Sequence, residues 1–130
     1  MLGKTTILKT LDGAYAARAR GDKKAVSKYW APGARYHLIG GQHALSKIAK
    51  GPAKKSVEDL MALFKFKSHK RLSAIVDGNN AVVRWRVKVA AKGKKAANTE
   101  ICDFWKFNNA GKAVSLTQYT DTALIERLIS

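Results

Sequence analysis

The stretch AVVRWRVKVAAKGKKAANTEICDFWKF, residues 81–107, decides the fold class. In residues 81–91, apolar side chains such as Val83 and Trp85 alternate with basic ones, which is typical of a strand with one buried face. Residues 97–107 alternate in the same way, and the lysines and glycine between the two runs favour a turn. We therefore predict two neighbouring antiparallel strands that bury one apolar face.

Strand patterns of the same kind flank this pair. Residues 69–76 alternate up to the turn sequence Asp77-Gly78-Asn79-Asn80, and residues 114–120 follow the turn sequence Asn108-Asn109-Ala110-Gly111. Together these runs predict an antiparallel meander of four strands. A short separate strand is expected earlier, over residues 34–39.

The remaining residues favour helices. Residues 4–20 repeat apolar side chains at helical spacing, and Gly21 follows as a helix-ending residue. Asp22 is expected to cap a second helix of about ten residues. Pro32-Gly33 would end that helix, because proline cannot continue the hydrogen-bond ladder.

The middle of the chain is patterned more weakly. Residues 40–51 are expected to form a loop with a short helix over 44–48. After Pro52, the sequence Ser56-Val57-Glu58-Asp59 is close to a capping box and predicts the start of a third helix. Residues 123–128 predict a terminal helical turn. The element order indicates an α+β domain over residues 1–130, with helices on the concave face of a curved, mostly antiparallel sheet.

Composition bounds the possible functions. The chain has 130 residues, which fits one domain, and its hydrophobic content of 46% excludes intrinsic disorder. No apolar stretch has the roughly 18–20 residues of a membrane span, and we expect no membrane partner and no secretory leader. The single cysteine, Cys102, excludes an internal disulfide and a cysteine-rich zinc site, and we expect a cytoplasmic protein.

The formal net charge is +16, which raises the possibility of a nucleic-acid binder. The lysines are spread along most of the chain and greatly outnumber the arginines, which suits a solvated basic surface better than a dedicated recognition face. A surface enriched in lysine by engineering would have the same pattern. In either case we expect non-specific attraction of polyanions.

Four segments carry a resemblance over nearly the whole chain: YAARARGD at 15–22, YWAPGA at 29–34, DFWKFNNAGK at 103–112 and QYTDTA at 118–123. Their order and spacing resemble the nuclear-transport-factor-2-like superfamily, on the branch of the SnoaL-like polyketide cyclases and ketosteroid isomerases. The resemblance implies a cone-shaped α+β barrel with a cavity between sheet and helices.

The resemblance also implies roles for individual residues. The carboxylate base of the isomerases corresponds to Leu38, which cannot accept a proton, while its neighbour His37 points to the other face. Tyr15 lies one residue from the position of the isomerases' oxyanion-donating tyrosine. The second oxyanion donor, an aspartic acid, is retained as Asp103. Asp121 lies near an acidic residue that ends the last strand of SnoaL-like cyclases.

Asp103 is the most informative candidate, because it lies in mid-strand between apolar residues on the expected buried face. A carboxylate there needs a partner or stays protonated. Two roles are open: a neutral acid that holds a ligand oxygen, or a structural hydrogen bond to Tyr15, Tyr36 or Gln118. The candidate catalytic residues are Asp103, Tyr15, His37 and Asp121. The candidate ligand-binding residues are Trp30, Tyr36, Leu38, Trp85, Trp105, Phe107 and Gln118.

These residues favour a small protein with a hydrophobic pocket for an apolar ligand that bears a carbonyl or hydroxyl group. If it is an enzyme, we expect isomerase, cyclase or dehydratase chemistry by proton transfer, with no cofactor and no metal. The first alternative is a non-catalytic binding or scaffold domain of the same fold. The second alternative is a basic nucleic-acid binder. We also expect a homodimer through the outer sheet face, where Cys102, Phe104 and Tyr119 are placed.

Overall fold

One sheet contains all six strands of the described chain, residues 2–40 and 50–129 of the computed structural model. The strands are β1 (Trp30–Leu38), β2 (Lys50–Pro52), β3 (Lys65–Asp77), β4 (Asn80–Ala90), β5 (Ala97–Phe107) and β6 (Ala113–Thr120). Their order is β2-β1-β6-β5-β4-β3. Neighbours pair antiparallel except β1 and β6, which are parallel.

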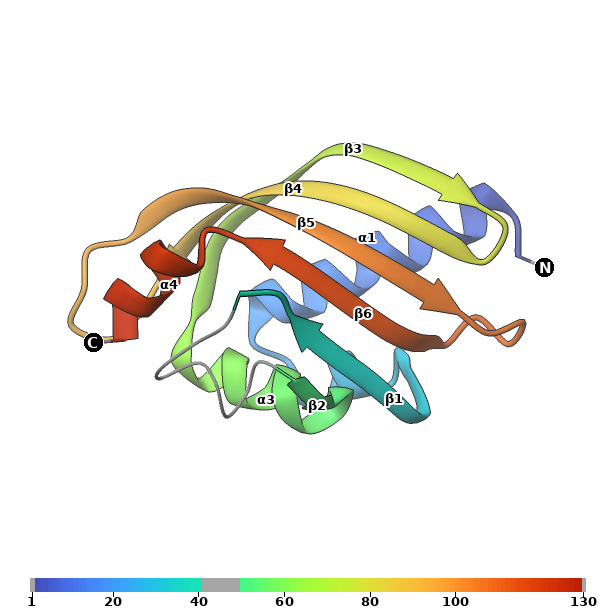
Figure 1. The fold of residues 1–130 in the computed structure, drawn as a ribbon, viewed down its shortest axis with the longest axis horizontal. Helices are drawn as coiled ribbons and strands as arrows, with labels where there is room; N and C mark the ends of the chain where they lie inside the picture. The colour runs from blue at the N-terminus through green and yellow to red at the C-terminus, as the bar shows by residue number, and fades with distance from the viewer. Residues whose placement is uncertain (1, 41–49, 130) are drawn as a thin grey trace.

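Four helices in the same ranges accompany the sheet: α1 (Lys4–Arg20), α2 (Lys23–Ser27), α3 (Ala53–Leu63) and α4 (Thr122–Ile129). In Figure 1 the long strands β3, β4 and β5 arch over α1, while α3 lies by β2. α4 lies at the opposite end of the molecule from the start of α1. The expected α+β architecture, with helices on the concave face of a curved sheet, is confirmed.

The pattern that predicted α1 also explains its packing. Ile7, Leu11 and Tyr15 recur at four-residue spacing and are buried. Gly21 ends the helix in the left-handed conformation, at φ 74°, which glycine adopts without a steric penalty. Asp22 then caps α2 by accepting a 3.0 Å hydrogen bond from the backbone N–H of Ala25.

The expectation of a ten-residue second helix ended by Pro32-Gly33 is wrong. α2 has only five residues, and Pro32-Gly33 lies within β1. Trp30 pairs with Ala113, so β6 draws this segment into the sheet. The β1–β6 register shifts between Trp30 and Arg35, which leaves room for a proline without an N–H group and for Gly33 at φ 76°.

The expected start of the third helix is also wrong. α3 begins at Ala53, directly after Pro52, and Ser56 is buried in its first turn without acting as a cap. The preceding strand β2 was not anticipated, because three residues are too few to show an alternating pattern. The helix expected over 44–48 lies outside the described residues.

The meander β3 to β6 follows the sequence pattern, except that β3 begins at Lys65, four residues before the expected start at 69. The turn between β3 and β4 joins Asp77 to Asn80, and β5 has the bounds expected from its alternation. Inward-facing Val83 and Val87 are fully buried, while Arg84 on the outer face forms an ion pair with Glu100 at 3.2 Å. The concave side of the sheet is therefore apolar and the convex side largely charged.

Candidate functional site

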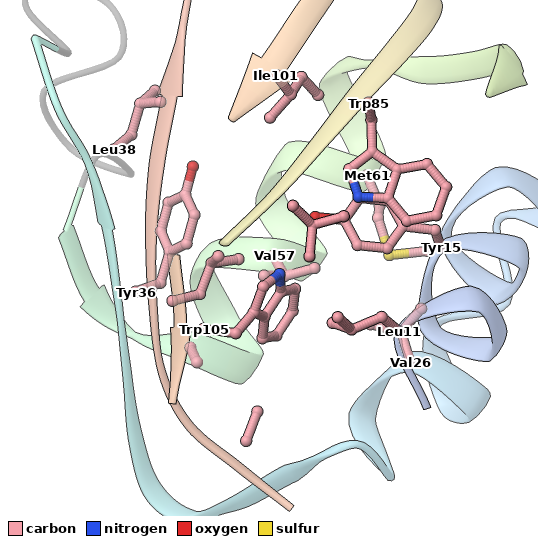
Figure 2. Packing of buried hydrophobic residues seen from close by; sticks show 14 of the residues in the cluster. Leu11, Tyr15, Val26, Tyr36, Leu38, Val57, Met61, Trp85, Ile101 and Trp105 are labelled. Carbon is pink, nitrogen blue, oxygen red and sulfur yellow. The ribbon is translucent and has the colours of Figure 1, made fainter. Parts of the chain in front are cut away.

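A cavity of about 90 Å³ lies between the concave face of the sheet and the helices. Most of its lining is apolar, with aromatic side chains from several elements. Figure 2 shows Tyr36 on β1 at one side, Tyr15 on α1 at the other, and the ring of Trp105 between them. The volume exceeds what one water molecule requires, so the cavity can hold a small ligand.

Five of the seven expected ligand-binding residues line this cavity: Trp30, Tyr36, Leu38, Trp105 and Gln118. The other two, Trp85 and Phe107, are buried behind it. The ring of Trp85 stacks on Tyr15 at a centroid distance of 4.0 Å, and Phe107 stacks on Trp105 at 5.9 Å. Their positions are those of core residues that support the cavity wall.

Three hydrogen-bond donors among the lining residues have no partner. The hydroxyl of Tyr15 and the indole N–H groups of Trp30 and Trp105 are buried and unpaired within the described chain. Leaving a buried donor unpaired costs about 1–3 kcal/mol, and native structures keep few such groups. A ligand with an acceptor oxygen would satisfy donors of this kind.

Asp103 is completely buried next to this wall, although it does not line the cavity itself. Neither carboxyl oxygen has a hydrogen-bond partner of good geometry among the described residues. Burial raises the pKa of Asp103 from 3.8 to about 8, and the side chain of Gln118, which lies opposite in the β5–β6 register, partly opposes this shift. The carboxyl group is therefore mostly protonated at neutral pH.

Gln118 connects Asp103 to the cavity. The hydroxyl of Tyr36 donates a 2.9 Å hydrogen bond to Oε1 of Gln118, and both side chains line the cavity. Burial raises the pKa of Tyr36 above its usual 10.0, which keeps the hydroxyl neutral, although Arg18 opposes this shift. Asp103, Gln118 and Tyr36 thus form a row of neutral polar groups along one wall.

Arg18 is the main site residue that the sequence analysis missed. Arg18 lines the cavity, and its guanidinium donates to the backbone carbonyl oxygens of Phe64 at 2.9 Å and Leu60 at 3.4 Å. It also lies 4.3 Å above the ring of Phe66. Arg18 falls seven residues after the buried Leu11 on α1, so helical spacing alone could have placed it on the inward face.

The other two catalytic candidates lie away from the cavity lining. His37 is exposed, because the alternation of β1 turns it away from the inward-facing Tyr36 and Leu38. Asp121 is exposed and caps α4 by accepting a 3.1 Å hydrogen bond from the backbone N–H of Leu124. The geometry thus brings Tyr15 and Asp103 to the cavity region and leaves His37 and Asp121 outside it.

No metal centre is formed by the residues that the structure describes, since no three His, Cys, Asp or Glu side chains gather there. His69 packs with its ring tilted against Trp85, and His43 lies outside the described ranges. Within residues 2–40 and 50–129, no helix combines the length and apolar character needed to cross a membrane.

The fold is shared with solved structures of low sequence identity. A candidate isomerase from Bacillus subtilis is 10% identical, with a TM-score of 0.85 over 99% of this chain and 96% of the other. An NTF2-like protein of unknown function from Burkholderia pseudomallei is 24% identical, with a TM-score of 0.75 over 96% and 98%. An LEH-like epoxide hydrolase from M. tuberculosis is 12% identical, with a TM-score of 0.73 over 96% and 90%.

The sequence itself identifies the family. No curated protein matches the chain. Residues 11–116, however, match the SnoaL-like domain, and this range contains α1 from Leu11 onward, the meander up to Leu116 and most of the cavity lining. The chain therefore belongs to the SnoaL-like domain family of the nuclear-transport-factor-2-like superfamily.

Proposed function

We propose that the cavity binds an apolar, ring-containing ligand with a carbonyl or hydroxyl oxygen. The observation that carries this proposal is the set of three unpaired donors in a largely apolar lining, on Tyr15, Trp30 and Trp105. Flat aromatic walls favour a ring, and buried donors favour an acceptor oxygen on it.

We further propose that the bound ligand undergoes proton transfer beside its carbonyl group, as in isomerase, cyclase or dehydratase chemistry, without a cofactor. When a proton leaves the neighbouring carbon, negative charge develops on the carbonyl oxygen. Donation from Tyr15 would stabilise that charge. Asp103 takes up the leaving proton in its ionised form and returns a proton to carbon as the neutral acid, because a pKa of about 8 leaves both forms present near neutral pH.

The ketone 2-acetylnaphthalene tests both parts, because it is apolar, carries one acceptor oxygen and has exchangeable protons beside its carbonyl. Calorimetry measures its binding, and NMR in D₂O measures deuterium incorporation into its methyl group. We expect saturable binding and exchange faster than in buffer. Absence of binding would overturn the proposed function, and binding without faster exchange would overturn its catalytic part.

Tyr15→Phe separates a binding role from a packing role. The Tyr15 hydroxyl has no partner within the described chain, so its removal should leave the unfolding free energy unchanged or slightly raised. Affinity for 2-acetylnaphthalene should nevertheless fall at least about fivefold, the value of one hydrogen bond. Tyr119→Phe, at a half-exposed position on the outer face, is the matched control and should change neither quantity.

Asp103→Asn tests the acid. The amide keeps the shape of the side chain but cannot release a proton at this site, so deuterium exchange should fall at least about tenfold while binding persists. An unchanged exchange rate would remove Asp103 from the reaction.

A non-catalytic binding domain is the second candidate, and Leu38 is the observation that favours it. Leu38 is 3% exposed and lines the cavity at the position where the resemblance implies a carboxylate base. No lining residue in the described chain is an aspartate, glutamate or histidine. A domain of this kind would bind 2-acetylnaphthalene without accelerating its exchange.

We also propose that the outer sheet face joins a second copy of the chain. Ile75, Val82 and Phe104 are consecutive partners across β3, β4 and β5, and Ile75 and Phe104 are exposed. Light scattering at micromolar concentration should report a dimer, and Phe104→Asp should convert it to a monomer. Thr6→Asp adds the same charge at an exposed position of α1 and should leave the dimer intact. A monomeric parent chain would refute this proposal.

A further inference from the structure

Arg18 places its own guanidinium cation beside the apolar cavity, and the contacts of the guanidinium fix it in this position. Two of its N–H groups donate to backbone carbonyl groups, on Leu60 in the last turn of α3 and on Phe64 directly after the helix, and its guanidinium plane covers the ring of Phe66. A guanidinium has five N–H donors, so these contacts leave three for other partners. The side chain is thus held in place without being saturated.

The charge of Arg18 has no acidic partner in the described part of the chain. Other arginines do have one: Arg71 pairs with Asp12 at 3.1 Å, and Arg84 pairs with Glu100 at 3.2 Å. The carbonyl groups at the end of α3 supply only part of a counter-charge, about half an elementary charge for a whole helix terminus. The cavity wall therefore carries a net positive charge at Arg18.

The surroundings strengthen the effect of this charge. Burial lowers the pKa of Arg18 from 12.5 to about 10, so the guanidinium still carries its charge at neutral pH but lacks the full hydration of a surface arginine. The Tyr36 hydroxyl lies close enough to interact with it electrostatically. An anion that enters here would meet a partly desolvated cation and a neutral hydroxyl donor.

We infer that the ligand of this cavity is an apolar acid, whose carboxylate pairs with Arg18 while its rings lie against the aromatic wall. A planar carboxylate matches the planar fork of a guanidinium and can accept two parallel hydrogen bonds from it. The inference rests on the proposed function only in so far as the cavity binds a ligand, and it is independent of the reaction.

A matched pair of ligands tests this inference. 2-Naphthoate and 2-acetylnaphthalene have the same rings and nearly the same shape, but only the first is an anion at neutral pH. We expect the wild-type chain to bind 2-naphthoate at least about tenfold more tightly in calorimetry, as for a charge-assisted hydrogen bond. Equal affinities would overturn the inference and leave the proposed function standing, whereas binding of neither ligand would overturn the proposed function.

Measurements at high salt distinguish the contribution of Arg18 to binding from that of the general positive charge of the chain. A net charge of +16 attracts any anion at low ionic strength, but that attraction is screened by salt, while a buried pair is screened much less. The preference for 2-naphthoate should therefore persist at about 0.5 M NaCl. Loss of the preference at that concentration would assign it to the surface and overturn the role of Arg18.

Arg18→Gln removes the charge and keeps polar contacts possible. It should lower the affinity for 2-naphthoate at least about tenfold and leave that for 2-acetylnaphthalene within about threefold. Lys9→Gln removes an equal charge from an exposed position of the same helix and should change neither affinity. If Arg18→Gln does not fold, Arg18→Met keeps the apolar stem and serves in its place. An unchanged preference for 2-naphthoate in the folded variant would overturn the inference.

Discussion

The hydroxyl of Tyr36 donates a 2.9 Å hydrogen bond to Oε1 of Gln118, which joins two strands that are 82 residues apart in the chain. This bond occupies the oxygen end of the Gln118 amide and leaves its NH₂ group to face other partners. Gln118 also lies opposite Asp103 in the antiparallel register of β5 and β6. One hydrogen bond therefore orients the side chain that partly opposes the raised pKa of the buried acid.

Tyr36→Phe should destabilise the fold by about 1–2 kcal/mol, because it leaves the Gln118 oxygen without its donor in a largely buried place. Denaturant-induced unfolding measures this free energy. Tyr119→Phe removes the same atom from a half-exposed ring and should cost less than about 0.5 kcal/mol. Equal losses in the two variants would mean that the Tyr36–Gln118 bond contributes no more than a surface hydroxyl.

The buried carboxyl group of Asp103 should make stability fall as pH rises. Its pKa is about 8 in the folded chain and near 3.8 when unfolded, so between these values the folded state binds one proton more than the unfolded state. Linkage then lowers the unfolding free energy by at most about 1.4 kcal/mol per pH unit in this window, and the effect levels off above it.

Asp103→Asn removes this titration. The unfolding free energy of the variant minus that of wild type should therefore increase from about pH 5 to about pH 8. Denaturant unfolding at both pH values gives the difference. Asp77→Asn, at an exposed carboxyl group in the β3–β4 turn, serves as the control for the general effect of charge. A difference between Asp103→Asn and wild type that stays constant with pH would show that Asp103 does not titrate as proposed.

Local patterns predicted the parts of the fold that local physics decides. The alternation over β4 and β5 and the helical spacing in α1 reflect one buried face each, and the structure follows them closely. The segment around Pro32-Gly33 was predicted wrongly, because its local signal ends a helix while pairing with β6, some 80 residues later, incorporates it into a strand. Long-range pairing of this kind leaves no trace within a short window of sequence.

The candidate site, too, was predicted correctly where local patterns decide it and incompletely where long-range packing decides it. The inward orientation of Asp103 and Trp105 follows from alternation, but the position of Asp103 behind the cavity wall depends on side-chain packing. Arg18 lies on the buried stripe of α1. A basic residue in the last turn of a helix, however, usually points into solvent, where its charge interacts favourably with the helix dipole. Only the approach of α3 and Phe66, which neither periodicity nor composition indicates, turns it into a cavity residue.

Gly13 should be required for the position of Tyr29, a cavity-lining residue. A Cβ atom at position 13 would lie 2.5 Å from the Tyr29 hydroxyl oxygen, so the ring would have to move. Gly13→Ala should therefore destabilise the chain by about 1–2 kcal/mol, although alanine favours a helix more than glycine by about 1 kcal/mol. Denaturant unfolding measures the sum of the two effects.

Tyr29→Phe provides the matched background, because it removes the atom that Gly13→Ala would meet. In that background the same alanine substitution should stabilise the chain by up to about 1 kcal/mol, since only the helix preference remains. The sign of the alanine effect therefore reports the contact. The same sign in both backgrounds would place the cost of Gly13→Ala elsewhere.

The basic surface should bind nucleic acid only through its general charge. Lysines are exposed on α1, α2, α3 and the strands of the meander, so the basic charge is spread over several elements of the described chain. Binding to duplex DNA and to single strands should therefore be measurable at about 20 mM salt and be lost near 150 mM, with a steep dependence on salt concentration. Fluorescence anisotropy of labelled oligonucleotides measures both. Retention of tight binding near 150 mM salt would favour a dedicated nucleic-acid site, and a preference for one sequence would strengthen that conclusion, because general attraction to phosphates carries no sequence information.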